Sequence, residues 1–205
     1  MAFTIRPADI IKIRAIDFLI ETFQGVVIGN EVKYGSSRKV VDLLALFKGQ
    51  TYAIEIKSSR DDLRRLTEQI TEYSKIFDYT IIFTTRDHFA KIQSLTKRNV
   101  SIYEISPDGI VVGNLSKKRN NTQKIEMLAT MNSAFIRKKL SISNAKDSDV
   151  IRKRGMRQKK EVIHSLLYDF FREKLSEPYK LFLEERGTIT DVDDINLLSN
   201  RLNVD

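Results

Sequence analysis

The chain has 205 residues, a formal net charge of +8, two histidines and no cysteine. This length allows one domain of ordinary size with an appendage. The lack of cysteine excludes disulfides and thiolate metal sites, and two widely separated histidines argue against an imidazole zinc site. No apolar run is long enough to span a membrane, and the first residues lack the continuous apolar core of a signal peptide. We therefore expect a cytoplasmic protein without a membrane partner.

The first two elements are predicted to be a helix and a strand. Apolar residues recur every three or four positions over residues 8–24, and Gly25 follows them. This spacing is typical of an amphipathic helix that ends at glycine. Residues 26–33 are apolar except for Glu31 and its neighbours and form a predicted strand. Charged residues are depleted in strands, so we expect Glu31 to have a partner, either a metal ion or Arg38.

A hairpin is predicted at the centre of the α/β part. Two apolar runs, residues 38–47 and 50–58, flank the dipeptide Lys48-Gly49. This pattern indicates two antiparallel strands joined by a two-residue turn. Both alternating sets of residues in the first run are apolar, so we expect layers on both faces of the sheet, as in an α/β domain.

The predicted turn determines which charged residues meet. With a two-residue loop, Asp42 lies opposite Glu55, and Lys57 shares their face because it lies two residues further along the strand. Two carboxylates on a buried surface repel each other unless a cation binds between them. Hard oxygen ligands suit Mg²⁺, with Mn²⁺ as the other candidate. The alternative interpretation is a structural ion pair at the end of a sheet.

The next helix, expected over residues 60–77, begins after Ser58. Asp61 and Asp62 are predicted to cap it and to place negative charge in its first turn. Gln69 and Tyr73 lie one turn apart on its surface. Without further information, Tyr73 is expected in the core and Gln69 at its boundary.

The remaining elements before residue 115 alternate in type. They are a strand at 79–84, a helix at 87–98 and a closing hairpin of strands at 100–105 and 110–112. The predicted order of elements is therefore α-β-β-β-α-β, followed by α-β-β. We expect residues 1–114 to form one α/β core.

The rest of the chain is predicted to be helical and basic. Residues 115–124 are polar, basic and without periodicity, which is typical of a linker, and residues 125–205 show helical spacing. We expect one helix over residues 125–140, a polar loop over 141–149, a helix around residues 163–171, a short helix that begins at Pro178, and a last helix over 191–202. One short stretch concentrates positive charge without any acidic residue, and it contains Arg152, Lys153, Arg154, Arg157, Lys159 and Lys160. Such a cluster favours a polyanion and would bind phosphates without reading sequence. The alternative is a solvated loop.

The central residues resemble a known signature. Asp42 followed by Glu55-Ile56-Lys57 resembles the active-site motif of the PD-(D/E)xK nuclease superfamily, although Val41 stands where the name of the motif has proline. A wider set of residues between 26 and 85 is similar to sce7726-type proteins of that superfamily; it comprises Asn30-Glu31-Val32, Arg38, Asp42-Leu43, Glu55-Ile56-Lys57-Ser58, Asp61, Asp62, Arg65-Leu66, Gln69, Tyr73 and Phe77-Asp78.

The resemblance implies a fold and a set of roles. The fold is a restriction-endonuclease-like core, with a mixed central sheet flanked by helices, followed by an all-helical C-terminal extension. The implied metal ligands are Asp42, Glu55, Ile56 and Glu31, and Glu21 on the first helix is a further candidate by analogy with other members. The Gln69 and Tyr73 pair resembles the extension of RecB-like nucleases, which supports the substrate or the site.

These observations together predict a metal-dependent nuclease. It would hydrolyse phosphodiester bonds of nucleic acid, DNA in preference to RNA, with Lys57 positioning the attacking water. Arg38 and the basic cluster would contact the nucleic acid. Two alternatives remain open: a nuclease-fold protein that binds nucleic acid without cutting it, and a module that binds a partner protein. A homodimer also remains open.

Overall fold

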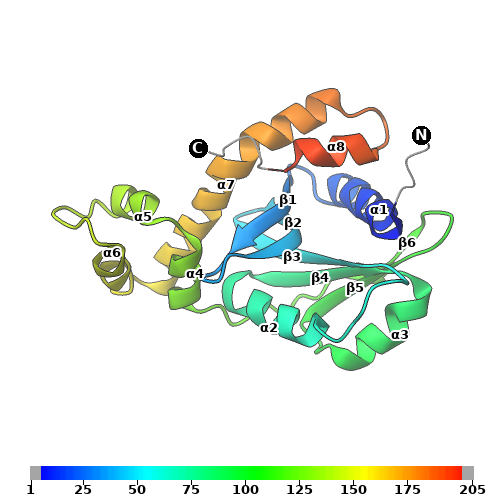
Figure 1. The fold of residues 1–205 in the computed structure, drawn as a ribbon, viewed down its shortest axis with the longest axis horizontal. Coiled ribbons are helices and arrows are strands. Elements are labelled where there is room, and N and C mark those ends of the chain that lie inside the picture. Colours follow the sequence, from blue (N-terminus) through cyan, green and yellow to red (C-terminus); the bar gives the residue numbers. More distant parts are fainter. Residues whose placement is uncertain (1–5, 200–205) are drawn as a thin grey trace.

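The computed structural model describes residues 6–199 and shows a mixed α/β fold (Figure 1). The strands are β1 (Val27–Tyr34), β2 (Lys39–Phe47), β3 (Gln50–Lys57), β4 (Tyr79–Thr84), β5 (Val100–Ile105) and β6 (Val111–Asn114). The helices are α1 (Pro7–Thr22), α2 (Leu66–Ile76), α3 (Arg86–Leu95), α4 (Lys124–Thr130), α5 (Ser133–Lys139), α6 (Ser148–Gly155), α7 (Lys160–Glu185) and α8 (Val192–Leu197). Up to β6, the predicted order of elements is confirmed.

The six strands form one sheet in the order β1-β2-β3-β4-β5-β6. The pairs β1–β2, β2–β3 and β5–β6 are antiparallel, whereas β3–β4 and β4–β5 are parallel. Each parallel pair is joined by a helix, α2 or α3, because parallel neighbours need a crossover. The expected mixed sheet is therefore present.

Helices cover both faces of the sheet, as the doubly apolar central strands predicted (Figure 1). One apolar cluster joins α1, α8 and the last turns of α7 to Ile28, Leu43 and Ile54. A second cluster joins α2 and the helices α4 to α7 to residues such as Leu44 and Ala53 of the opposite face. The central strands are buried between these two layers.

The helices beyond residue 124 share their core with the sheet. The long helix α7 passes so close to β1 that a Cβ on Gly29 would come within 2.5 Å of Leu175 Cδ2. The described part of the α/β region, residues 6–114, and the helices that follow it therefore contribute to a common apolar cluster. Pro178, which we expected to begin a separate helix, lies inside α7.

Residues 115–123 have no helix or strand, as expected of a linker, but they are held against the sheet. The backbone N–H of Asn120 donates to the carbonyl of Asp78 at 2.7 Å. The N–H of Gln123 donates to the carbonyl of Lys75 at the end of α2, also at 2.7 Å. The segment is thus a packed connection between β6 and α4.

The predicted start of the second helix is wrong. Helix α2 begins at Leu66, and its N-cap, Arg65, makes no capping hydrogen bond through its side chain. The Asp61 carboxylate instead accepts from the N–H and the hydroxyl of Ser58, at 2.7 and 2.6 Å. Asp62 pairs with Arg64. Both acids therefore bond within the loop that precedes the helix rather than in its first turn.

The helical part also differs from the sequence pattern. The single helix expected over residues 125–140 is divided into α4 and α5, because Asn132 caps the start of α5. Within the stretch that we interpreted as polar loop and basic cluster, Asp147 caps α6. The last expected helix, 191–202, is α8 up to Leu197, and residues 200–202 lie outside the described chain. Among residues 6–199, none of the helices is sufficiently long and apolar to cross a membrane.

Candidate active site

The register of the central hairpin places Asp42 and Glu55 as predicted. Lys48 and Gly49 form the turn with positive φ of 47° and 75°, the combination found in tight hairpin turns. The ladder runs from Phe47–Gln50 to Leu43–Ile54 without a slip. One step further along this ladder, Asp42 lies across from Glu55.

The two strands separate at Asp42, and its side chain fills the gap. Beyond the Leu43–Ile54 pair, Asp42 Oδ2 accepts a hydrogen bond from the backbone N–H of Ile56 at 2.8 Å. This carboxylate oxygen accepts the hydrogen bond from the β3 backbone that a carbonyl of β2 would accept in a continuous ladder. Oδ1 has no hydrogen bond within residues 6–199 and is available to a ligand. The sequence therefore folds locally so that one carboxylate is fixed at a point where the sheet opens.

The Glu55 carboxylate is the centre of a buried hydrogen-bond network. Its side chain is only 2% exposed. Oε1 accepts from Lys57 Nζ at 2.7 Å and from Gln69 Nε2 at 2.6 Å, and Oε2 accepts from the Tyr73 hydroxyl. Helix α2 supplies both neutral donors because Gln69 and Tyr73 are one turn apart. Tyr73 is fully buried, as expected of a core residue, but it also contacts the site.

Burial and neighbouring charges raise the pKa values of two groups at the site. Burial, with the nearby Glu55 carboxylate, raises the pKa of Asp42 to about 6, and the Ile56 N–H, Lys12 and Lys57 only partly oppose this. Burial and Glu55 also raise the pKa of Tyr73 far above its ordinary value, so its hydroxyl remains a proton donor. The two carboxylates therefore share a site that favours an additional positive charge.

Lys12 is the residue near the site that our sequence analysis missed. It lies on α1, is buried, and donates from Nζ to Asn30 Oδ1 at 2.9 Å. Asn30 Nδ2 in turn donates to Ser199 Oγ at 2.8 Å, so the end of the described chain supports this contact. The available signal was a lysine among the apolar positions of a buried helix, where a charge needs a partner.

The donor set suits a hard divalent cation. Gln69 Oε1 is a buried amide oxygen without a hydrogen-bond partner among the described residues, and it belongs to a side chain that contacts Glu55. Together with Asp42 Oδ1 and the Glu55 carboxylate, it offers oxygen ligands of the kind that Mg²⁺ accepts. Residues 6–199 contain no group of three or more His, Cys, Asp or Glu side chains that could hold a metal ion. Any metal here would therefore rely on two carboxylates and further oxygens.

Glu31 is not the buried acid that we expected. It lies in line with Asp42 along the β1–β2 ladder, but it is exposed and has a φ of 51°. This left-handed residue interrupts the alternation of the strand: Ile28 packs in the cluster beneath α1, whereas Val32 packs in the cluster of α2. Two even-numbered residues of a regular strand would share one face. The period-2 rule therefore could not place the Glu31 side chain.

Two other predicted residues lie at the surface. Glu21 is exposed near the end of α1. Arg38 is exposed in the turn before β2, with a φ of 53°. Arg38 therefore joins no buried network.

The basic cluster lies apart from Asp42 and Glu55. Its members belong to α6, to the turn before α7 and to the first residue of α7, at the end of the molecule where α5 and α6 project (Figure 1). Arg154 donates to the carbonyl of Ser143 at 2.7 Å, and Arg152 lies 4.0 Å from Asp149. The other four side chains, Arg157, Lys153, Lys159 and Lys160, are exposed or half-buried.

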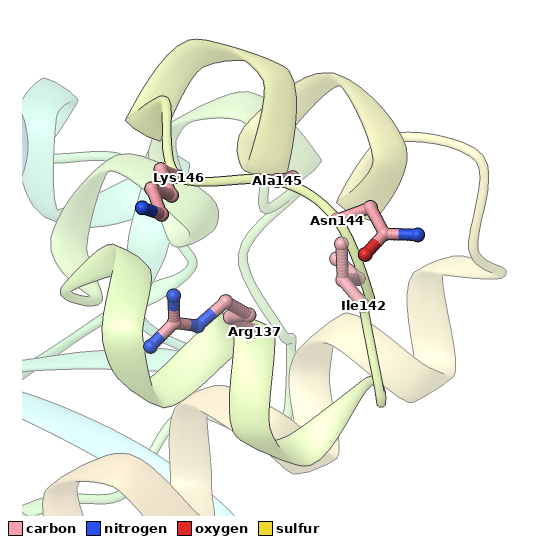
Figure 2. Close-up of a pocket in the computed structure, with 5 residues that line it drawn as sticks. All are labelled: Arg137, Ile142, Asn144, Ala145 and Lys146. Carbon is pink, nitrogen blue, oxygen red and sulfur yellow. The ribbon is translucent and has the colours of Figure 1, made fainter.

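A hollow between α5 and α6 is also separate from the acidic pair. It has a volume of about 530 Å³ and lies in the turn between α5 and α6, lined by Arg137, Ile142, Asn144, Ala145 and Lys146 (Figure 2). The lining residues do not include any member of the Asp42–Glu55 network.

Comparison with known proteins identifies a family but no activity. The model of the family described as Bacteriophage P4 protein cII matches residues 1–199. No curated protein matches the chain. A solved structure described as SPO1766, a protein of unknown function from Silicibacter pomeroyi, is 16% identical, with 92% of this chain and 100% of that chain covered and a TM-score of 0.48.

Proposed function

This chain belongs to the family of bacteriophage P4 protein cII, and we propose that it is a metal-dependent nuclease with a restriction-endonuclease-like core. The observation that carries the proposal is the gathering of Asp42, Glu55 and Lys57 at one point of the sheet, where Gln69 and Tyr73 also bind Glu55. The resemblance of these residues to the PD-(D/E)xK motif supports the same function.

Mg²⁺ or Mn²⁺ is the proposed cofactor. Asp42 and Glu55 would hold it, with Ile56 and Glu31 as the further ligands that the resemblance implies. A bound divalent cation supplies charge stabilisation at a phosphoryl oxygen and lowers the pKa of a bound water. The unpartnered oxygens of Asp42 and Gln69 support this assignment, since each is an acceptor without a donor in the described chain.

The protein groups around the site would orient the two carboxylates and the attacking water. The Ile56 N–H fixes the direction of the Asp42 carboxylate, and Gln69 and Tyr73 fix that of Glu55. The Lys57 ammonium group lies 2.7 Å from Glu55 and can hold an attacking water. Its charge would also offset the negative charge that develops on a phosphorane-like transition state.

The substrate is proposed to be nucleic acid, DNA in preference to RNA. The exposed arginines and lysines at 152–160 and Arg38 would contact phosphates, which gives affinity without sequence selection. These contacts are made by residues outside the buried network, so binding and hydrolysis depend on different parts of the chain.

One rival function has an observation in its favour. Both carboxylate oxygens of Glu55 already accept hydrogen bonds from Lys57, Gln69 or Tyr73, so the Glu55 side chain is held in place without a metal. A nuclease-fold protein that binds nucleic acid without cutting it would need nothing more. It predicts binding that is independent of divalent cations and no cleavage product.

A cleavage assay distinguishes the two functions. Supercoiled plasmid and a single-stranded oligonucleotide are incubated with the protein in EDTA, Mg²⁺ or Mn²⁺. We expect products only with a divalent cation and none from the Lys57→Ala variant. Lys48→Ala, which removes an exposed lysine from the hairpin turn, is the matched control and should cleave normally. Metal-independent binding without any product would contradict the proposal.

A further inference from the structure

Two basic stretches that are distant in sequence lie side by side in the fold. Lys124 Nζ donates to the carbonyls of Met156 and Gln158, at 2.6 and 2.9 Å. Lys160 Nζ lies 3.5 Å from Asn121 Oδ1. Figure 1 shows α4, α6 and the start of α7 gathered at the same end of the molecule. The segment 117–124, predicted to be a linker, therefore adjoins the cluster at 152–160.

One buried carboxylate is hydrogen-bonded to the first stretch and to the helix that follows the second. The buried carboxylate of Asp78 accepts from Arg119 of the first stretch and from His164 Nε2, 2.7 Å away, on α7 just beyond the second. This arrangement uses the charge of Arg119 internally. Five other cations of the two stretches remain exposed to solvent: Lys117, Lys118, Lys153, Arg157 and Lys159.

The combined surface has a large excess of positive charge. Neither 117–124 nor 152–160 contains an acidic residue. Lys117, Lys118, Arg157 and Lys159 are exposed and form no salt bridge within residues 6–199. The half-buried Glu126 follows the first stretch in sequence, and the second is flanked by Asp149, which lies 4.0 Å from Arg152, and by the exposed Glu161. Cations brought together by folding repel one another, so this surface favours a polyanion.

The composition of the surface indicates how the polyanion is recognised. Both stretches offer lysine, arginine and glutamine, and 117–124 adds asparagine; these side chains donate to phosphate and sugar oxygens. Neither stretch contains an aromatic residue, so bases of a single strand would have no ring on which to stack. The surface therefore suits the regular backbone of a duplex better than splayed single-stranded bases.

The surface begins close to the candidate active site. Gln123 N–H is bonded to the carbonyl of Lys75, and six residues earlier on the same helix Gln69 contacts Glu55. Six residues of α-helix span about 9 Å. A backbone bound along the surface could therefore reach Asp42 and Glu55 within a few base pairs, since each pair adds about 3.4 Å.

We propose that residues 117–124 and 152–160 form one binding surface for the backbone of double-stranded nucleic acid, continuous with the Asp42–Glu55 site. The position of the substrate over that site rests on the proposed function, whereas binding to the surface does not. The segment between β6 and α4 is then part of the substrate-binding apparatus.

Binding in EDTA tests the surface without any cleavage. The affinity for a duplex oligonucleotide is measured over a range of salt concentrations for the wild type and for Lys117→Gln/Lys118→Gln. The slope of log affinity against log salt should flatten by about 1.8 in the double variant, about 0.9 for each lost phosphate contact. Arg157→Gln/Lys159→Gln should flatten it by a similar amount. The matched control is Lys48→Gln/Lys91→Gln, which removes two exposed lysines elsewhere and should leave the slope unchanged.

Each other outcome has a defined meaning. An unchanged slope in Lys117→Gln/Lys118→Gln, or tighter binding of a single strand than of a duplex of equal length, would overturn the inference. Equal binding of an acidic polypeptide with the same number of charges would also overturn it, and would indicate a protein partner. If the slopes change as expected but the wild type never cleaves with Mg²⁺ or Mn²⁺, the surface stands and the nuclease function fails.

Discussion

Asp42 lies in β2 and Asp78 lies directly before β4, and the two aspartates have opposite surroundings. Asp78 accepts from the backbone N–H and the hydroxyl of Thr51, at 2.9 and 3.1 Å, and also from His164 and Arg119. Burial alone would raise the pKa of Asp78, but the hydrogen bonds from His164 and Thr51 hold it below its ordinary value. Asp42 accepts one backbone N–H, and burial together with Glu55 raises its pKa to about 6.

The difference separates a structural carboxylate from a candidate catalytic one. A buried carboxylate that serves the fold is normally saturated with donors, as Asp78 is. Asp42 and Glu55 place two negative charges together, and the chain balances them only in part, with Lys12 and Lys57. Perturbed carboxylates of this kind are concentrated at functional sites. Substitutions at the two aspartates should therefore affect different properties of the protein.

The largest expected effect is on cleavage. Ala at Asp42, Glu55 or Lys57 should lower the cleavage rate at least about 1,000-fold, which corresponds to roughly 4 kcal/mol of transition-state stabilisation. At saturating substrate, Asp78→Ala should leave the rate per folded molecule unchanged, because Asp78 supports the proposed binding surface but contacts no residue of the Asp42–Glu55 network. Single-turnover kinetics, normalised to the folded fraction by circular dichroism, check this. Full activity of Glu55→Ala would contradict the assignment of Glu55 to the active site.

The second effect is on stability and concerns Asp78. Asp78→Asn should lower the free energy of unfolding by about 2 kcal/mol, since charge-assisted hydrogen bonds from His164 and Arg119 are lost. Because the folded pKa of Asp78 is lowered, its stabilisation is present above the unfolded pKa and is lost as the pH falls through the folded value. Urea unfolding at pH 7 measures the change. Asp62→Asn, at an exposed pair with Arg64, is the control and should leave the midpoint unchanged.

The third effect has the opposite sign and concerns Asp42. Its folded pKa of about 6 lies above the ordinary value of 3.8, so folding favours the protonated form and stability falls as the pH rises from 4 to 6. Without metal, Asp42→Asn should therefore stabilise the protein at pH 8 by on the order of 2 kcal/mol. At pH 4 the gain should be absent. Thermal unfolding in EDTA at both pH values tests this, and equal midpoints at pH 8 would contradict it.

The sequence was sufficient to predict the hairpin because its turn is short and well marked. The two-residue Lys48-Gly49 loop between two apolar runs requires the register that the structure has. The start of α2 was mispredicted because Asp61 satisfies Ser58 in the preceding loop, a competition between cap and turn that local propensity does not resolve. The contact of Lys12 with Asn30 depends on how α1 crosses the sheet, which no local pattern specifies.

At Glu31, the alternation of apolar residues no longer predicts which face of the sheet a side chain occupies. Both strands of the β1–β2 pair change faces at this row, since Val41 packs with the α2 cluster and Leu43 with the α1 cluster, although both are odd-numbered. A positive φ at a residue other than glycine cannot be read from apolar alternation. Non-glycine residues in this conformation cost about 1 kcal/mol or more and are concentrated at functional sites.

The smallest expected effect distinguishes the two remaining acids. Glu31 lies in the same row of the sheet as Asp42, whereas Glu21 lies near the end of α1. Because both side chains are exposed, water screens their charges, and we expect Glu31→Gln to weaken Mn²⁺ binding less than about tenfold, a change of roughly 1.4 kcal/mol. Glu21→Gln should leave the affinity unchanged and is the matched control. Calorimetric titration of both variants and the wild type decides between them. Weaker binding in Glu21→Gln alone would assign the further ligand to α1, and the β1 row would then serve only to open the sheet at Asp42.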